Sequence, residues 1–498
     1  MKNQQPHWHS LDRDALRAWQ MLKLRRYLAG TVLPFSAHYK TLFKRNHLRP
    51  GAIRDWASLE RVPFSAKEDL LKGSRDFILI PDESVLKRRP STILSALFRG
   101  RDTVAEEFER EFRPLMMTST TGRSAEPAPF VYTAQDVQTL SIAGARVMRI
   151  CNARRDMRML NMFPFAPHLA FWQTHYAGME FGVFMVSTGG GKALGTEGNL
   201  RLMRKIEPEV LIGMPTFIYH VLNAAVEEGM HCPKLSKIVL GGEKAPVGMR
   251  RRLRALASAL GADSIDVLPT YGFTEAKIAW TQCPCGNPAE TSGYHLNPDF
   301  GIIEVIDPAT GRQVPDGEPG EVVWTPLEAR GSVVLRYRTG DTVSGGLVYG
   351  TCPHCGRNMP RLIGEISRTS EIREIRLEKL KGTLVDFNRL EHVLDDCHDV
   401  ATWQLEIRKT HDDPLELDEL ILHVHKANGI PDEAVRARLE EHFAAETETH
   451  PNRIEFHTAE TLRRMQGVGT LLKEQRVVDH RPLAKAPEPR EALCQSKI

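Results

Sequence analysis

The sequence has little excess of either charge: Lys and Arg total 66 and Asp and Glu 63, a formal net charge of +3 over 498 residues. This balance does not call for a nucleic-acid partner, which would favour a strongly basic surface. The sequence also lacks a run of about 18 apolar residues, which argues against a membrane span. Its first residues, MKNQQPHWHSLDRD, are polar and contain no apolar signal segment. We therefore expect a cytoplasmic protein.

Cysteine is scarce, with eight residues in the chain, but four of them form two close pairs. Cys283 and Cys285 lie in CPCG, and Cys352 and Cys355 lie in CPHCG. Without an export signal, such pairs favour metal binding over a disulfide framework. We expect the four cysteines to hold one structural Zn²⁺ ion, because two thiolate pairs can complete a tetrahedral site. His295 stays open as a replacement for one member of the first pair, and free thiols are the alternative.

The length and the pattern of apolar runs indicate more than one domain of α/β class. The 41% of hydrophobic residues can build a sizeable core, and 498 residues exceed one ordinary domain. Between residues 130 and 275, apolar runs of strand length such as PEVLIGMP and LSKIVLGG alternate with helical stretches. This alternation predicts parallel βαβ units with ligand-binding loops at the strand ends. We see no internal repeat.

The domain boundaries follow changes in composition. Residues 300–350 contain short strands separated by Pro- and Gly-rich turns, which predict a small β-rich piece within a large N-terminal domain over 1–369. Residues 370–480 have the pattern of a small α+β domain, and the Pro-rich, polar residues 481–498 that of a disordered tail. Residues 77–113 are expected to be a helical surface insertion. Their basic, amphipathic part leaves contact with a membrane or a partner open.

Two short stretches point to local structure. Ser65 precedes KEDLLKG, with Glu68 three residues later, which is the spacing of a capping box and predicts a helix capped by Ser65. The stretch MTSTTGR gathers Thr118, Ser119, Thr120, Thr121 and Gly122 in one loop. Such a loop is either a flexible connection or a phosphate-binding site, because small residues let backbone N–H groups approach an anion and hydroxyls add donors.

Several further motifs follow this loop in order, and together they resemble one family. They are LGGEKAP at 240–246, YGFTEA at 271–276, YRTGD at 337–341 and a lysine in LLKEQRVVD. The chain resembles the adenylate-forming superfamily, in its phenylacetate–CoA ligase-like branch, from about residue 15 to 480. The usual P-loop lysine is missing, which separates the chain from ordinary P-loop NTPases.

The resemblance implies a role for each motif. The hydroxyl loop, Thr118–Gly122, would hold the β- and γ-phosphates of ATP, although Met117 and Ser119 replace family residues. Gly241, Gly242 and Glu243 would form the adenine-side loop, while Tyr271 and Gly272 would lie against the adenine. Thr274 would contact the α-phosphate, and Glu275 would hold Mg²⁺. Such donors and metal charge reduce the repulsion between a carboxylate nucleophile and a phosphate.

The resemblance also assigns residues near and beyond the domain boundary. Asp341 would bind the ribose hydroxyls, a strong pairing between a charged acceptor and O–H donors. Arg368, in PRLIGEISRTSE, matches the phosphate-contacting arginine of the hinge. Lys473 matches the lysine that serves adenylation, although Leu472 replaces a family glycine.

Aromatic residues gather in MFPFAPHLAFWQTHYAG at 162–178. Dense aromatics are usually core, and the alternative is that they line an apolar or aromatic acid pocket. The candidate pocket residues are Phe163, Phe165, His168, Phe171, Trp172 and His175.

The resemblance implies an enzyme that uses ATP and Mg²⁺ to convert a carboxylic acid to an acyl-adenylate and then transfers the acyl group to CoA. An amine, a carrier protein or an enzyme thiol is the alternative acceptor, and a non-catalytic nucleotide-binding protein is the second alternative. The identity of the acid and the oligomeric state, with a homodimer among the options, stay open.

Overall fold

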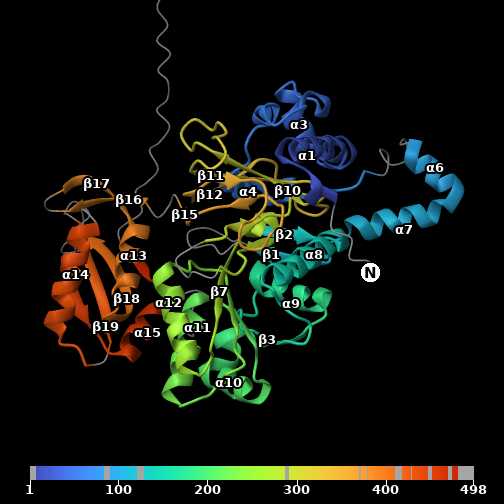
Figure 1. The fold of residues 1–498 in the computed structure, drawn as a ribbon. Coiled ribbons are helices and arrows are strands. Elements are labelled where there is room, and N and C mark those ends of the chain that lie inside the picture. Colours follow the sequence, from blue (N-terminus) through green and yellow to red (C-terminus); the bar gives the residue numbers. More distant parts are fainter. Residues whose placement is uncertain are drawn as a thin grey trace, which may run out of the picture. The chain divides into compact units, whose positions relative to one another are not determined.

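A computed structural model gives the structure of the protein (Figure 1). It describes residues 7–82, 90–119, 128–285, 291–368, 372–377, 380–409, 418–427, 429–446, 451–468 and 474–480. The chain divides into two compact units, Met1–Glu371 and Ile372–Ile498. Among the described residues, no helix combines the length and apolar character needed to cross a membrane.

The centre of the first unit is a six-stranded sheet with strand order β4-β3-β5-β6-β7-β8. Its first five strands pair in parallel, and β8 joins β7 antiparallel. The strands are β3 (Arg158–Asn161), β4 (Phe184–Ser187), β5 (Val210–Gly213), β6 (Lys237–Leu240), β7 (Asp266–Gly272) and β8 (Ala279–Thr281). The α/β class and the parallel βαβ units expected from the sequence are thereby confirmed.

Helices cover both faces of this sheet, because successive strand residues point to opposite sides. On β5, Leu211 packs into a core with α10, α11 and α12, whereas Val210 and Ile212 pack into a core with α8 and α9. Figure 1 shows these helices around the strands. The helices are α8 (Ala134–Ile150), α9 (Leu169–Phe181), α10 (Gly190–Ile206), α11 (Pro215–Glu227) and α12 (Val247–Ala259).

Smaller sheets are formed by the residues that come before and after those of the large sheet in the chain. The β-rich piece is an antiparallel sheet of order β10-β11-β12-β15, next in sequence to a small sheet of order β13-β14-β9. A pair of strands, β1 and β2, precedes α8. Their bounds are β1 (Met116–Ser119), β2 (Pro129–Tyr132), β9 (Tyr294–His295), β10 (Gly301–Ile306), β11 (Gly320–Pro326), β12 (Tyr337–Val343), β13 (Leu347–Val348), β14 (Arg361–Leu362) and β15 (Ile366–Arg368).

The N-terminal segment is helical. The Asp12 side chain caps its first long helix by accepting a hydrogen bond from the backbone N–H of Ala15 at 2.9 Å. The helices are α1 (Arg13–Tyr27), α3 (Ala37–Arg45), α4 (Lys67–Gly73), α6 (Pro90–Arg99) and α7 (Arg101–Phe112). The last two lie within the expected insertion at 77–113, and α6 exposes Leu97 and Phe98.

The prediction that Ser65 caps α4 is wrong. The helix begins at Lys67 with Ala66 as its N-cap residue, and the Asp69 carboxylate accepts the Ala66 N–H at 2.9 Å. The buried Ser65 hydroxyl instead donates to the carbonyl of Leu335 at 2.9 Å. A tertiary contact between distant segments thus takes the hydroxyl that local spacing had assigned to the helix.

The second unit is built on a four-stranded sheet of order β20-β19-β18-β21. Trp403 and Phe443 are fully buried in its core. Its elements are β16 (Ile372–Leu377), β17 (Leu380–Asp386), α13 (Phe387–Asp396), β18 (Val400–Lys409), β19 (Asp418–Lys426), α14 (Asp432–Glu446), β20 (Arg453–Phe456), α15 (Ala459–Gln466) and β21 (Val477–Asp479). The expected tail at 481–498 lies outside the described residues.

Candidate active site

Three of the residues assigned to the nucleotide meet at the junction of two sheets. The hydroxyl of Tyr271, at the end of β7, donates to the Asp341 carboxylate on β12 at 3.0 Å. Arg368 lies opposite Asp341 in the β12–β15 register, and its Nε donates to the other carboxylate oxygen at 3.0 Å. Burial, and next the charge of Asp341, raise the pKa of Tyr271, so its hydroxyl stays a proton donor to that carboxylate. Asp341 is thus held from two strands.

Glu275 lies in a short 3-10 turn, Thr274–Ala276, that directly follows β7. Its Oε1 accepts a hydrogen bond from the hydroxyl of Tyr337 at 2.7 Å. Burial raises the pKa of the Glu275 carboxyl, and the hydrogen bond from Tyr337 opposes that effect. Glu275 is half-buried, and a carboxylate has more lone pairs than this bond uses, which leaves capacity for a cation.

Sequence reasoning missed Tyr337, although the stretch YRTGD contained the signal. Residues 337 and 341 are four apart on β12, so their side chains leave the strand on the same face. Tyr337 bonds to Glu275, which lies just after β7, and Asp341 bonds to Tyr271, which lies on β7. One strand therefore supports both the residue assigned to the metal and the residue assigned to the nucleotide.

The structure describes two residues of the hydroxyl loop. Thr118 is fully buried on β1, where its hydroxyl donates to the Tyr132 hydroxyl at 3.3 Å. The N–H of Ser119 donates to the Pro167 carbonyl at 2.7 Å, and Nδ1 of His168 lies 3.3 Å from the Ser119 carbonyl oxygen. The start of the loop is therefore fixed beside the aromatic segment. Thr120, Thr121 and Gly122 lie outside the described residues, as does Lys473.

The Gly241–Glu243 loop follows β6 and approaches the neighbouring strands closely. A Cβ atom on Gly241 would lie 2.4 Å from the Thr270 hydroxyl and 3.3 Å from the Phe163 ring, so only glycine fits. Gly242 has a φ of +80°, a left-handed conformation that favours glycine. Oε2 of Glu243 accepts a hydrogen bond from the Thr216 hydroxyl at 2.7 Å, which ties the loop to the first turn of α11.

The predicted aromatic residues form a cluster around the start of α9. The ring centroid of Phe171 lies 5.1 Å from that of Phe165 and 5.3 Å from that of Trp172, both edge-on, and 6.3 Å from that of His175. Phe163 and Phe171 are buried, whereas Phe165 is 68% exposed. The cluster thus reaches from the core beside Gly241 to the surface.

The structure brings three of the four paired cysteines together with His295. Donor atoms of Cys283, His295, Cys352 and Cys355 all lie within 4.8 Å of one another. Cys285 is not part of that group, and its Sγ lies 3.5 Å from the Cys283 carbonyl oxygen.

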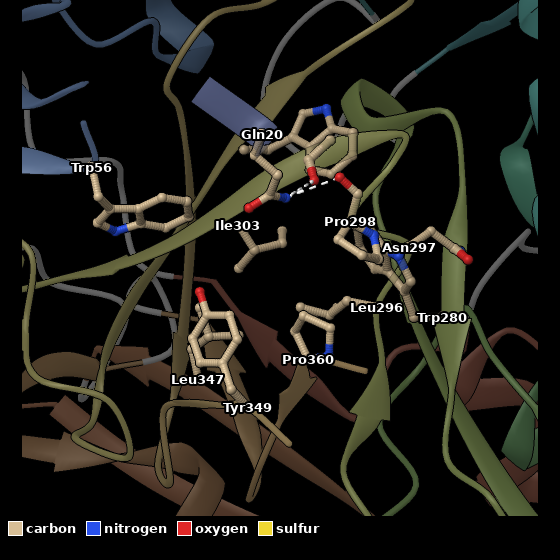
Figure 2. A pocket seen from close by; sticks show the side chains of 12 residues that line it. Gln20, Trp56, Trp280, Leu296, Asn297, Pro298, Ile303, Leu347, Tyr349 and Pro360 are labelled. Carbon is tan, nitrogen blue, oxygen red and sulfur yellow. Dashed lines mark hydrogen bonds between the residues drawn. The ribbon is translucent and has the colours of Figure 1, made fainter. Parts of the chain in front are cut away.

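A small cavity elsewhere in the first unit contains none of the predicted site residues. Trp56, Trp280, Leu347 and Tyr349 contribute to its walls, and Figure 2 shows Gln20 reaching into it. The Gln20 Nε2 donates to the carbonyls of Pro298 at 2.9 Å and Gly301 at 3.2 Å. These bonds connect α1 to the β-rich piece, so we assign the cavity to packing between them.

The chain is similar to known proteins over most of its length. A family model described as AMP-binding enzyme matches residues 89–328. A phenylacetate-coenzyme A ligase of Thermus thermophilus is 26% identical over 388 residues, 77% of this chain and 77% of that protein. A phenylacetate-coenzyme A ligase of Escherichia coli is 24% identical over 413 residues, 81% of this chain and 82% of that protein.

The fold is that of a solved 2-hydroxyisobutyryl-CoA ligase in complex with R3-HIB-AMP, with a TM-score of 0.75 at 18% identity over 96% of this chain and 94% of that one. The matched sequence model and the curated relatives indicate an adenylate-forming enzyme, and the chain is similar to that superfamily in sequence and fold. Within it, the chain is phenylacetate–CoA ligase-like, an AMP-forming acid–thiol ligase by class.

Proposed function

We propose that this protein activates an apolar, aromatic carboxylic acid with ATP and transfers the acyl group to CoA. The observation that carries the proposal is the contact of Tyr271, Asp341 and Arg368 near the half-buried Glu275, on strands from two sheets. The curated relatives are phenylacetate-coenzyme A ligases, which supports both the acid and the acceptor.

In the first step, a carboxylate oxygen of the acid attacks the α-phosphorus of ATP. The bond from that phosphorus to the bridging oxygen breaks, and pyrophosphate leaves with the bonding electrons. In the second step, the thiolate of CoA attacks the acyl carbon of the adenylate, and AMP leaves. Both steps conserve charge and atoms once the thiol proton has passed to solvent.

Asp341 is suited to hold the ribose. One of its carboxylate oxygens accepts a bond from Tyr271 and the other accepts one from Arg368, and a carboxylate oxygen can accept more than one hydrogen bond. The two ribose hydroxyls can donate one hydrogen bond to each carboxylate oxygen of Asp341. Hydrogen bonds to an ionised acceptor are about twice as strong as those between neutral groups. We propose that Tyr271 and Gly272 lie against the adenine, with Gly241, Gly242 and Glu243 on its other side.

Glu275 fits a divalent cation, because Mg²⁺ prefers carboxylate oxygen and Tyr337 orients this one without occupying all its lone pairs. Bound Mg²⁺ would offset the negative charge of the phosphates. We propose that Thr274 contacts the α-phosphate and that the hydroxyl loop, Thr118–Gly122, holds the outer phosphates. Its backbone N–H groups would serve as donors to the anion.

Lys473 is proposed to stabilise the charge that develops on the transferred phosphoryl group during adenylation only. A lysine carries a compact charge on a flexible stem, which suits a group that must enter and leave the site. Arg368 lies at the end of the first unit, three residues before the division between the units at Glu371, and is proposed to contact phosphate when the units rearrange.

The aromatic cluster is the proposed site of the acid. Phe163 lies close to the Gly241 loop, and His168 contacts Ser119 at the start of the hydroxyl loop. An acid lying among Phe165, Phe171, Trp172 and His175 would therefore place its carboxylate toward the nucleotide. Rings packed edge-on favour a planar aromatic ligand over a flexible chain.

A pyrophosphate-release assay over aryl, alkyl and amino acids, with ATP and Mg²⁺, tests the first step. We expect release with arylacetic or benzoic acids and little with the others. Replacing CoA with hydroxylamine in a second set of reactions separates the acceptors, because hydroxylamine traps any acyl-adenylate. A thioester formed with CoA supports the proposal. No pyrophosphate release with any acid would refute it, and acyl transfer to hydroxylamine but not to CoA would refute the assignment of the acceptor.

A further inference from the structure

We propose that Cys283, His295, Cys352 and Cys355 bind one structural Zn²⁺ ion, and that Cys285 is not a ligand. Cys283 lies just after β8 and His295 on β9, whereas Cys352 and Cys355 lie more than 50 residues further along, between β13 and β14. The sequence pairs alone had suggested four cysteines, so the structure changes the ligand set to three thiolates and one imidazole.

The distances fit a tetrahedron around Zn²⁺. Sγ of Cys283 lies 3.8 Å from Sγ of Cys352, and Sγ of Cys355 lies 3.3 Å from Nε2 of His295. In a tetrahedral site with Zn–S bonds of about 2.3 Å and a Zn–N bond of about 2.0 Å, these edges are about 3.8 Å and 3.5 Å. The two sulfurs are far beyond the disulfide bond length of about 2.05 Å, so the cluster is not an oxidised pair.

The orientation of His295 is that of a metal ligand. Its Nδ1 lies 3.0 Å from the carbonyl oxygen of Gly293, which can only accept a hydrogen bond. Nδ1 must therefore carry the proton, and Nε2 presents its lone pair toward Cys355. Metal-binding histidines generally have their second ring nitrogen fixed in this way by a carbonyl or a carboxylate.

The local backbone supports the second pair. The N–H of Gly356 donates to the Cys352 carbonyl at 2.9 Å, and the N–H of Cys352 donates to the Arg357 carbonyl at 2.9 Å. Gly356 has a φ of +70°, which closes the turn and leaves both thiols on its inner side. The sequence CPHCG thus forms a tight turn of the kind that presents two thiolates to one ion.

Three of the four proposed ligands are buried, as expected of a structural ion, and Cys355 is half-buried. Cys283 and Cys352 are each 1% exposed and His295 is fully buried. Cys283 and Cys352 lie in a core that contains Trp8 and Leu16, so the cluster also lies beside the N-terminal segment. Structural zinc sites have four protein ligands and no open position, whereas catalytic sites keep one for water.

A zinc ion here would fasten the two segments that carry the proposed nucleotide site. Cys283 follows β8, which pairs with β7 through Tyr271 and Trp280. Cys355 precedes β14 and then β15, whose last residue is Arg368. The proposed ion is thus a cross-link within the first unit. It does not depend on the reaction that the protein catalyses.

Metal analysis of the purified, reduced full-length protein tests the proposal, with cells grown with zinc and no chelator used. We expect about one zinc per chain, as for a closed four-ligand site. X-ray absorption of the same sample should show three sulfur neighbours and one nitrogen neighbour. Less than about a tenth of an equivalent of zinc, in reduced protein, would overturn the proposal and leave a metal-free thiol–imidazole network.

Matched serine variants then assign the ligands. Cys352→Ser should lose the zinc and lower the unfolding temperature, whereas Cys285→Ser should keep it, and Cys232→Ser serves as a control at a distant cysteine. If Cys352→Ser does not fold, the sulfur and nitrogen count from the unmodified protein decides the ligand set. Four sulfur neighbours, or loss of zinc in Cys285→Ser with retention in His295→Ala, would overturn the assignment in favour of four cysteines.

Discussion

Replacing Tyr337 with phenylalanine tests the proposed metal-binding role of Glu275 through a single hydrogen bond. The Tyr337 hydroxyl donates to Oε1 of Glu275 at 2.7 Å, and the rest of the ring is buried on β12. Tyr337→Phe keeps that packing and removes only the donor. Burial already raises the pKa of Glu275, and the lost bond had opposed this effect, so the carboxyl pKa rises further in the variant.

The size of the effect follows from the charge of the acceptor. A hydrogen bond to a charged group contributes about 1.5–3 kcal/mol, which corresponds to about 10- to 150-fold in an equilibrium. We expect Tyr337→Phe to lower the apparent affinity for Mg²⁺ by about 10- to 100-fold near neutral pH. The acid limb of its pH–rate profile should move to higher pH, because binding the cation requires the ionised carboxylate.

The assay is pyrophosphate release at several Mg²⁺ concentrations across the pH range. Tyr349→Phe is the matched control, because it removes a hydroxyl that accepts a bond from Arg17 at 3.1 Å, outside the proposed nucleotide site. Saturating Mg²⁺ should restore much of the rate of Tyr337→Phe. An unchanged Mg²⁺ dependence and an unchanged acid limb in this variant, with normal folding, would refute the assignment of the metal to Glu275.

The remaining predictions concern the nucleotide loop, the ribose and the lysine of the second unit. Asp341→Asn should weaken ATP binding by about 10-fold or more, since it removes a charged acceptor; equal ATP affinity by calorimetry would contradict the ribose assignment. Gly241→Ala should lower both ATP affinity and thermal stability, because the added Cβ would lie 2.4 Å from the Thr270 hydroxyl; rescue by Thr270→Ala in the double variant would verify the clash. Lys473→Ala should slow acid-dependent pyrophosphate release by about 10²- to 10³-fold, yet convert a supplied acyl-adenylate to thioester at near-normal rate, and equal damage to both steps would argue against a role in adenylation alone.

The sequence predicts the central sheet well because its signal is local. Each parallel strand is a short apolar run that ends in small or turn-forming residues, and the two faces are covered by helices from the intervening segments. Confirmed strands such as β5 and β6 lie within the stretches PEVLIGMP and LSKIVLGG. The predicted helix cap at Ser65 is wrong because the contact that the hydroxyl makes is not local. It bonds to the carbonyl of Leu335, 270 residues further along the chain.

At the candidate site as well, local sequence signals predicted individual residues but not the contacts between distant segments. The order of motifs singled out Tyr271, Glu275 and Asp341, since each lies in a short stretch with recognisable neighbours. The contacts between them depend on how the end of β7 meets β12 across about 70 residues, and neither stretch encodes that alignment. Tyr337 could be linked to Asp341 by strand periodicity, but not to Glu275.

The metal cluster shows why residue types alone do not determine a ligand set. The four cysteines formed two pairs in sequence, which made a four-thiolate site the simplest arrangement. In the folded protein, the β9–β14 pairing places His295 opposite Arg361, in the small sheet whose β13–β14 connection contains CPHCG. The bond from Nδ1 to Gly293 then turns Nε2 toward Cys355. A ligand on a strand is held by the register of that strand, whereas the Sγ of Cys285 contacts the carbonyl of Cys283, two residues earlier. If His295→Ala loses the zinc and Cys285→Ser keeps it, then strand pairing rather than cysteine spacing selects the ligands of this site.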